Sequence, residues 1–517
     1  MICHAPAYKT AGASSLPTLH SLRSPLILLL LLTLSMGCRK DLQFTDDPGV
    51  TLEFSEDSVL FDTIFTSVGS VTKRFVARNN GTFAVKVDIA LEGGSPSPFR
   101  MNVDGATGIT FIDVEILGGD SIFVFVEATL GPGGSDDPFI IEDHILFNTN
   151  GNAQEVLLTA WGQDAHFFYP DRGGGGLPEY SIIAGWDEVL DTTVCETVTW
   201  PNDKPYVIYG YGVVDSCSTL IIDPSVRVYV HGGGGLWIYR FGRIQAMGLP
   251  DDRITFQGDR LEPQYQDVPG QWERIWINDG ALDQDNEFRN CDIRNALVGI
   301  QCENFPFYPN AATSEAKLIL DKVSIRGCSA AGLLSRNYRV TATNTLFADC
   351  GQYSVALTGG GQYDFNFITV ANYWNVSGAI RNSPAFVMTN TYEDLINNVL
   401  QVREIFTSTF RNMIVEGANT NEFLIELDPG NAADHTFRNC ILRTDQQTND
   451  TGHFPDQLTI WRNQNPGFTD VGAADFHLAS INAFAVDKGF AGTGVFDDLD
   501  GDARDAAPDV GCYEFTP

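Results

Sequence analysis

The sequence predicts an all-β protein in two parts, a β-sandwich followed by a coil of short repeated strands. The 517 residues include 50 Gly, 34 Phe and 16 Tyr, and residue types that favour strands and tight turns are abundant. Long stretches with apolar residues at helical spacing are nearly absent. Hydrophobic residues make up 43% and charged residues 19%, which excludes a disordered chain and a multi-span membrane protein.

The charge balance is strongly acidic. The chain has 32 Lys and Arg against 66 Asp and Glu, a net charge of −34. A field of that sign repels phosphate backbones, so a nucleic-acid partner is not expected.

Residues 1–37 are predicted to be a signal peptide. Arg23 precedes an apolar run over 26–34, and Ser35-Met36-Gly37 leads into Cys38. A basic segment, a short apolar core and small residues before a cleavage point are typical of secretion. The Cys after Gly37 resembles a bacterial lipoprotein signal, although Ser35 stands where that family usually has Leu. The resemblance implies a lipid on Cys38.

The lipid would hold the protein on a membrane without a transmembrane helix, with residues 38–48 as a linker. The alternative is an ordinary signal peptide with a chance Cys. The charged residues Arg39-Lys40-Asp41 resemble signals that send Gram-negative lipoproteins to the cell surface. The expected location is therefore the outer membrane, exposed on the surface or facing the periplasm.

In residues 49–165 apolar and polar residues alternate, as they do in half-buried strands. Turns such as Asn79-Asn80-Gly81 and Gly118-Gly119-Asp120 separate them. Short strands at this spacing favour an immunoglobulin-like β-sandwich. Residues 166–179, with Gly173–Gly176, are predicted to be a linker. The expected strands are Thr51–Phe54, Ser58–Thr66, Thr72–Asn79, Ala84–Leu91, Ile109–Ile116, Ser121–Thr129 and Glu155–Trp161.

Residues 180–517 contain a repeat with an Asn or Asp at positions 290, 321, 344, 366, 412 and 439. The gaps of 31, 23, 22, 46 and 27 residues indicate a unit of 22–23 residues, with 46 as two units. Such a unit without a helix fits one rung of a right-handed parallel β-helix. The Asn suits a tight bend that stacks on the next rung. Apolar residues expected in the lumen are Phe288, Ile293, Leu346, Phe347, Phe367, Phe410, Phe437 and Ile441.

Three stretches add a family resemblance. Leu220–Tyr229 and Arg253–Asp259 resemble the opening rungs of right-handed parallel β-helix proteins among bacterial surface lipoproteins and adhesins. The segment Phe476–Glu514 resembles the choice-of-anchor Q ending, with Cys512 where the family usually has Ala. The resemblance implies the fold over 180–517, with a C-terminal cap from about 475. It implies little about activity.

The cysteines allow two interpretations. Cys195 and Cys217 are 22 residues apart, as are Cys328 and Cys350. Disulfides are possible in an oxidising compartment, with Cys195–Cys217 as one candidate. Buried thiols stacked in the lumen are expected for most of the others.

An acidic cluster near the C-terminus has oxygen ligands suited to Ca²⁺. Asp498, Asp500, Asp502 and Asp509 are the candidate ligands. Ala503 stands where an EF-hand loop needs Gly, so a capped turn without metal is the alternative, and no other cofactor is expected.

Aromatic and basic residues along the repeats are candidates for ligand binding. Exposed rings beside a groove stack on sugars, and Tyr373, Trp374 and Trp272 are the candidates. The arginines Arg289, Arg294 and Arg326 can bind the same ligand. With Asp292, Asp321 and Asp349 they would also suit a polysaccharide lyase or glycoside hydrolase.

These observations predict a monomeric surface lipoprotein that binds an extracellular glycan or a surface protein without catalysis. The first alternative is a polysaccharide lyase or glycoside hydrolase, and the second is a structural envelope component.

Overall fold

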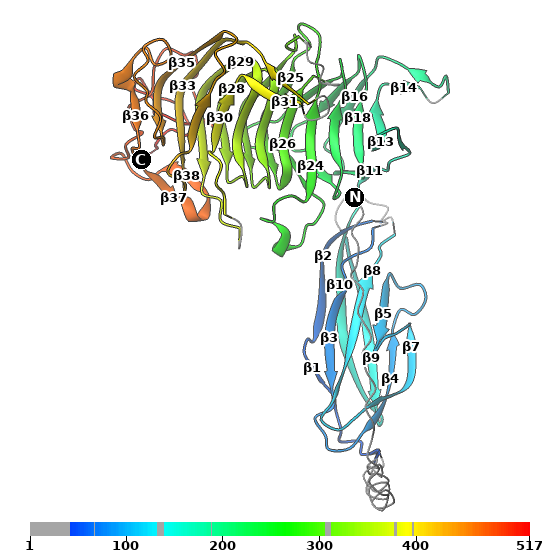
Figure 1. The fold of residues 1–517 in the computed structure, drawn as a ribbon. Coiled ribbons are helices and arrows are strands. Elements are labelled where there is room, and N and C mark those ends of the chain that lie inside the picture. The colour runs from blue at the N-terminus through cyan, green and yellow to red at the C-terminus, as the bar shows by residue number, and fades with distance from the viewer. Residues whose placement is uncertain are drawn as a thin grey trace, which may run out of the picture.

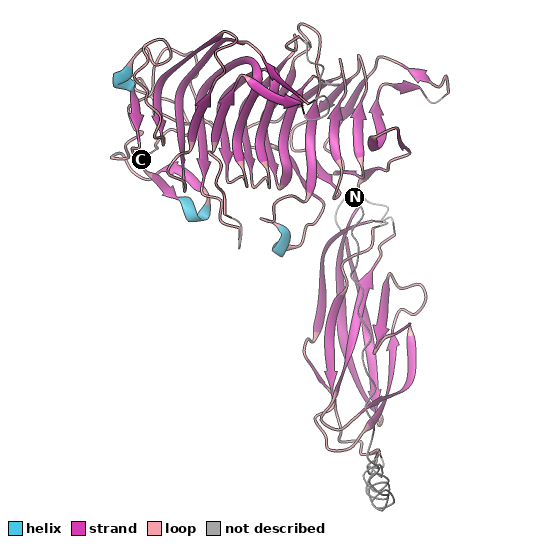
Figure 2. Ribbon diagram, viewed as in Figure 1, coloured by secondary structure: helices cyan, strands magenta, loops and turns pink. Residues whose placement is uncertain are grey.

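The protein is all-β, as predicted. A computed structural model describes residues 42–66, 68–131, 139–187, 189–304, 312–376, 380–394 and 398–516. Within these ranges the helices are three 3-10 turns, η1 (Pro263–Tyr265), η2 (Gln457–Thr459) and η3 (Val471–Ala473). Figures 1 and 2 show an elongated sandwich that meets a larger body of stacked strands near that body's first turns.

The sandwich consists of two five-stranded sheets. Alternating apolar residues such as Val85, Val87 and Ile89 point into one shared core, because successive side chains of a strand face opposite sides. All seven predicted strands are present to within a few residues, and the structure adds β5 (Phe99–Val103), β6 (Ala106–Gly108) and β9 (Phe139–Thr149). The first sheet has the order β1 (Glu53–Phe54), β3 (Lys73–Arg78), β8 (Ser121–Ala128), β5 (Phe99–Val103) and β6 (Ala106–Gly108). The second has the order β2 (Ser58–Phe65), β10 (Asn152–Gln163), β9 (Phe139–Thr149), β4 (Val85–Leu91) and β7 (Thr110–Ile116).

Residues 166–462 form the coiled body, whose strands pair in three parallel ladders. Successive strands of the chain belong to the first, second and third ladders in turn. Three successive strands therefore make one rung of the stack. The first ladder starts with β16 (Thr197–Trp200), β19 (Thr219–Ile222) and β22 (Arg243–Met247). The second starts with β11 (His166–Phe168), β17 (Tyr206–Ile208), β20 (Arg227–Val230) and β23 (Ile254–Gly258). The third starts with β13 (Leu177–Ala184), β18 (Tyr211–Val214), β21 (Gly235–Ile238), β24 (Trp272–Ile277) and β26 (Ala296–Glu303).

From β25 onwards, long bent strands serve more than one ladder. The first and second ladders continue through β25 (Asn286–Arg294), β27 (Lys317–Arg326), β28 (Ala331–Ala348), β29 (Tyr353–Asn372), β33 (Ile405–Gly417) and β35 (Ala433–Leu442), and the second ends at β36 (Ile460–Arg462). The third ladder continues through the first halves of β28 and β29 to β30 (Phe386–Thr389) and β34 (Phe423–Glu426).

Short antiparallel pairs lie outside the ladders. They are β14 (Trp186–Asp187) with β15 (Thr192–Thr193), β31 (Thr391–Asp394) with β32 (Val399–Val402), and β37 (Phe468–Asp470) with β38 (Asp475–Leu478).

The predicted linker over 166–179 is wrong. Its residues supply β11 and β12 (Arg172–Gly174), and β12 pairs with β13. Gly174, Gly175 and Gly176 all have positive φ, so they make the tight turn between these two strands.

The bend expected at the repeated Asn is present in the long strands. Asn290, Asn344, Asn412 and Asn439 have φ between 46° and 53°. In the other two rungs the bend falls one residue later, at Lys322 and Phe367 rather than at 321 and 366. The 46-residue gap is a single rung with insertions, because Asn366 pairs directly with Arg411. We call this line of bends the asparagine corner.

Two expectations about the C-terminal part are wrong. Residues 463–516, the C-terminal segment, do not close the end of the stack but run back along the asparagine corner. Asn439 Nδ2 donates to Lys488 O at 2.7 Å, and Asn344 Nδ2 donates to Asp497 O at 2.9 Å. Leu346 and Ile441 therefore pack outside the lumen, under Phe476 and Leu478, and Phe367 lies under the Arg504 guanidinium. The other five predicted residues lie in the apolar core inside the coiled body, which we call the lumen core.

Candidate functional site

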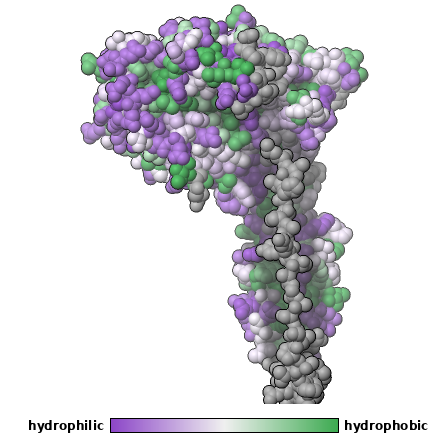
Figure 3. Space-filling model, viewed as in Figure 1, coloured by the Kyte–Doolittle hydropathy of each residue, from purple (hydrophilic) through white to green (hydrophobic). Residues whose placement is uncertain are grey.

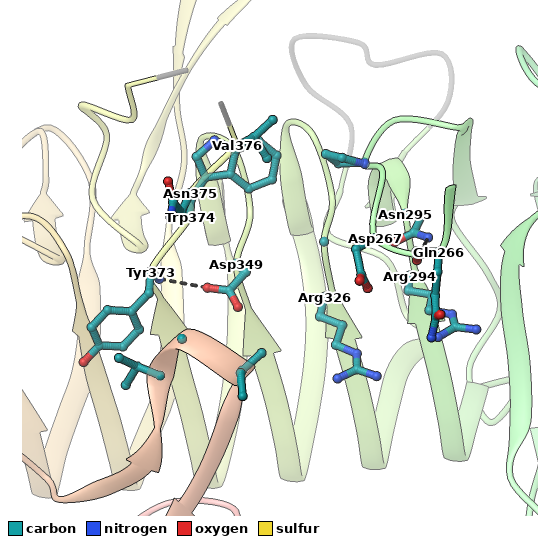
Figure 4. Close-up of a pocket in the computed structure, with 16 residues that line it drawn as sticks. Gln266, Asp267, Arg294, Asn295, Arg326, Asp349, Tyr373, Trp374, Asn375 and Val376 are labelled. Carbon is teal, nitrogen blue, oxygen red and sulfur yellow. Dashed lines mark hydrogen bonds between the residues drawn. The ribbon is translucent and has the colours of Figure 1, made fainter. Parts of the chain in front are cut away.

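A groove of about 620 Å³ lies on one rim of the coiled body. We call it the rim groove. Its floor comes from three consecutive rungs, and its walls come from three excursions of the chain (Figure 4). The lining residues are Gln266, Asp267, Pro269, Arg294, Asn295, Arg326, Gly327, Asp349, Tyr373, Trp374, Asn375, Val376 and residues 471–474.

The floor is a second line of bends, at Asn295, Gly327 and Asp349. All three have positive φ, and these residue types accept that conformation more readily than others. Each backbone N–H in this line donates to the next rung, as in Gly327 N to Ala348 O at 3.2 Å. The bends end the second-ladder strands together, so the residues just before them align across the rungs.

Arg294 and Arg326 stand side by side on this floor. They are direct partners in the parallel pairing of β25 and β27. Arg294 Nε donates to Gln257 Oε1 at 2.7 Å. Arg326 is exposed. Among the described residues no carboxylate forms an ion pair with either guanidinium.

Asp349 lies one rung beyond Arg326 and is half-buried. Its Oδ1 accepts the Tyr373 N–H at 2.8 Å. Loss of water contact raises the pKa of the Asp349 carboxyl to about 6, although this hydrogen bond, Arg326 and Arg381 oppose the shift. The groove therefore holds a carboxyl group that changes charge near neutral pH.

Tyr373 and Trp374 form the next part of the wall. The Trp374 N–H donates to Asn372 Oδ1 at 3.2 Å, a local turn that directs the chain out of the rung. Gly351 makes room for the indole, because a Cβ there would meet Trp374 Cζ2 at 3.2 Å. Both aromatic side chains are partly exposed.

A buried ion pair holds the far end of this wall. The Arg381 and Glu422 side chains are 3% and 0% exposed, and Nη1 of Arg381 lies 2.7 Å from Glu422 Oε2. Arg381 Nη2 also donates to Asn372 O at 2.8 Å. The pair therefore ties the excursion to the rung that it leaves.

Four of the six predicted ligand-binding residues meet in the rim groove: Tyr373, Trp374, Arg294 and Arg326. Trp272 does not present its ring, because it is 1% exposed and its Nε1 donates to Arg294 O at 2.9 Å. Arg289 lies elsewhere and pairs with Asp321 at 3.0 Å. Asp292 pairs with Arg253 at 2.9 Å, so of the three predicted acids only Asp349 joins the groove.

The groove also contains residues that the sequence analysis missed, chiefly Gln266, Asp267, Asn295 and residues 471–474. A local signal exists for the floor: Ile293-Arg294-Asn295 and Ile325-Arg326-Gly327 repeat an apolar residue, an Arg and a residue tolerant of positive φ. No local signal exists for the missed wall residues, Gln266, Asp267 and residues 471–474, which come from distant excursions.

Two of the four predicted Ca²⁺ ligands, Asp498 and Asp509, accept hydrogen bonds from the backbone. Asp498 Oδ1 accepts the N–H groups of Asp500, Gly501 and Asp502, and both Asp509 oxygens also accept backbone N–H groups. Asp500 Oδ2 lies 2.8 Å from His477 Nε2. Within the described part of the chain, no group of three or more His, Cys, Asp or Glu side chains is arranged to hold a metal ion.

Cys195 and Cys217 form a disulfide in the structure. Cys291, Cys302, Cys328, Cys350, Cys440 and Cys512 are free and buried. Five of them lie in the lumen core, and Cys512 belongs to the C-terminal segment, where it packs in the cluster of Leu346 and Phe476. Cys38 lies outside the described residues. No helix in the described ranges is long and apolar enough to cross a membrane.

Comparisons with known proteins yield only remote likenesses. No protein-family model and no curated protein matches the chain. Among solved structures, the Escherichia coli chaperone DraB is 11% identical, with 22% of this chain and 55% of that chain covered and a TM-score of 0.16. The match thus spans about half of the chaperone. A PapD-like domain of human CEP192 is 16% identical, covering 23% and 89%, with a TM-score of 0.16. The CooA pilin subunit of enterotoxigenic E. coli is 14% identical, covering 23% and 99%, with a TM-score of 0.17.

Proposed function

We propose that this chain is a non-catalytic carbohydrate-binding protein of the bacterial surface, with the rim groove as its binding site. In this proposal residues 166–462 are a right-handed parallel β-helix, residues 49–163 are an immunoglobulin-like sandwich, and a lipid on Cys38 anchors both. Three parallel ladders visited in turn support the first assignment, and two packed five-stranded sheets support the second.

The observation that carries the proposal is the meeting of Trp374 with Arg294 and Arg326 in one open groove. Tyr373 also lines the groove, but its ring stacks on Phe476 with centroids 6.2 Å apart. Aromatic faces stack on the apolar faces of sugar rings, and arginines and amides hydrogen-bond sugar oxygens. The visible face of the coiled body has many hydrophilic residues with hydrophobic patches between them (Figure 3).

A binding screen tests this function. The purified chain is titrated with neutral and acidic polysaccharides by calorimetry, alongside Trp374→Ala. Loss of a stacked ring is expected to weaken binding about tenfold or more. Trp161→Ala is the matched control, because Trp161 is 36% exposed on the sandwich. Equal affinity of Trp374→Ala and the parent chain for every polymer would contradict the proposal.

A second candidate function is cleavage of the bound glycan by a lyase or hydrolase. Asp349 favours it, because a carboxyl group with a pKa of about 6 can exchange a proton with a substrate near neutral pH. Incubation with uronate polymers, followed by absorbance of unsaturated products and by reducing-end assays, tests this. Product formation that Asp349→Asn abolishes would establish catalysis in place of binding alone.

A further inference from the structure

The floor of the rim groove holds two neighbouring arginines in a molecule that is acidic overall. The chain has 66 acidic and 32 basic residues, and many arginines of the coiled body reach a carboxylate. Examples are Arg253 with Asp292 at 2.9 Å and Arg336 with Glu303 at 2.6 Å. Arg294 and Arg326 differ, because the described residues supply neither with an ion pair.

The two arginines are also direct neighbours. Partners on adjacent parallel strands are about 4.8 Å apart. Like charges placed opposite each other on a sheet are destabilising unless an opposite charge lies between them. Arg411 and Arg438 are paired in the same way, but there Asp364 lies 2.7 Å from Arg411. Within the described ranges no carboxylate forms the corresponding ion pair at Arg294 or Arg326.

The acids that line the groove do not fill this role. Asp267 is exposed on the opposite wall and forms no ion pair with either arginine. Asp349 uses Oδ1 to accept the Tyr373 N–H, and its half-buried position disfavours its charge. The floor therefore holds two neighbouring arginines (Figure 4), and Trp374 lines the same groove.

We propose that Arg294 and Arg326 together bind an anionic group of the glycan, the carboxylate of a uronic acid or a sulfate ester. The groove then selects acidic polysaccharides. The inference rests on the proposed function, because it assigns a ligand class to the same groove. Guanidinium groups bind both anions through paired N–H donors.

Three polymers distinguish the possibilities: polygalacturonate carries carboxylates, dextran sulfate carries sulfates, and dextran is neutral. Arg326→Gln is expected to weaken binding of the preferred acidic polymer about tenfold or more. Binding of the parent chain is also expected to fall steeply with salt.

Arg339→Gln is the matched control. Arg339 also lies opposite a cation, Lys317, and no ion pair to it is present among the described residues, but it is outside the groove. Its replacement changes the net charge equally and should alter affinity less than twofold.

Preference for either acidic polymer, lost in Arg326→Gln, supports the inference and identifies the anion. If dextran binds as tightly as both acidic polymers and its binding depends on Trp374, the inference about an anionic ligand is wrong, while the proposed carbohydrate binding stands. An equal loss of affinity for the acidic polymer in Arg339→Gln and Arg326→Gln would also overturn the inference, since affinity would then follow the net charge of the protein. Failure of all three polymers to bind would remove the proposed function as well.

Discussion

Asp349 links the charge of the rim groove to pH. Its pKa is raised to about 6 because it is partly removed from water, while the Tyr373 N–H, Arg326 and Arg381 favour the charged form. Below pH 6 the carboxyl is mainly neutral and the positive charge of Arg326 is uncompensated. Above pH 6 the carboxylate competes with an anionic ligand for that charge.

We expect affinity for an acidic polysaccharide to fall as pH rises through about 6. Asp349→Asn keeps an oxygen that can accept the Tyr373 N–H but cannot ionise. Its affinity should therefore vary little between pH 5 and pH 8, about the range around this pKa. Calorimetry across this range measures the effect. A parent chain with pH-independent affinity would show that Asp349 does not act on the ligand.

His477 connects β38 to the turn at Asp498–Asp502. Its Nε2 lies 2.8 Å from Asp500 Oδ2, its Nδ1 lies 2.5 Å from Asp475 Oδ1, and its ring centroid lies 3.9 Å from that of Tyr513. The hydrogen bond to Asp500 and the contact with Asp475 raise the His477 pKa to about 9, against the opposing effect of burial.

A pKa raised on folding stabilises the fold fully below the unfolded value of 6.5, and this stabilisation is lost as pH rises through about 9. We expect the melting temperature to fall over this window, and His477→Gln to reduce the slope. His144→Gln, on the sandwich, is the control for loss of an imidazole. Parallel pH profiles for His477→Gln and the parent chain would contradict this role.

At the scale of elements, two lines of bends organise the coiled body in different ways. The asparagine corner is covered, because its side-chain amides bond the C-terminal segment, as in Asn412 Oδ1 with the Phe490 N–H at 2.6 Å. The floor of the rim groove is open, because the excursions stand beside it rather than over it. One corner of the body therefore serves stability and the other can serve binding.

The buried pair of Arg381 and Glu422 should fix the wall that carries Trp374. Arg381→Met leaves a buried, unpaired carboxylate and is expected to cost about 3–5 kcal/mol of unfolding free energy. Arg411→Met is the control, because its partner Asp364 is 52% exposed and such pairs contribute about 0–1 kcal/mol. Denaturant unfolding followed by Trp fluorescence measures both. Equal stabilities of the two variants would show that the wall does not depend on this pair.

At the scale of the whole molecule, the sandwich and the coiled body have separate cores. They meet through a small apolar cluster in which the ring centroids of Phe65 and Tyr229 lie 5.1 Å apart. Contacts within the coiled body run mainly between neighbouring rungs. Damage to a late rung should therefore stay in that body.

Phe410 tests this independence. Its ring stacks on Phe437 with centroids 4.5 Å apart, inside the lumen core. Phe410→Ala is expected to cost about 3–5 kcal/mol and to lower hydrogen-exchange protection over 390–440. Phe406→Ala, 37% exposed on the same strand, is the control. Loss of protection over 49–163 in step with 390–440 would show that the two parts unfold together.

The predicted anchor is also a property of the whole molecule. Cys38→Ala should move the protein from the membrane fraction to the soluble fraction, because it removes the acyl chains that would be buried in the bilayer. Fractionation with immunodetection measures this, with Cys440→Ala, a buried thiol of the coiled body, as the control. Continued membrane association of Cys38→Ala would contradict lipidation as the anchor.

The local pattern of residues determined seven of the ten strands of the sandwich, a repeat unit near 22 residues and the bends at Asn290, Asn344, Asn412 and Asn439. These features depend on period-two alternation and on tolerance of positive φ, which neighbouring residues set by themselves. Tertiary structure alone decided that residues 166–179 form part of the first rungs, since their strands need β17 and β18 as partners. It also decided that Leu346 lies under the C-terminal segment and that Trp374 and Arg326 line the same groove. Those placements join residues separated by many rungs or by whole excursions, so the packing of the complete chain determines them.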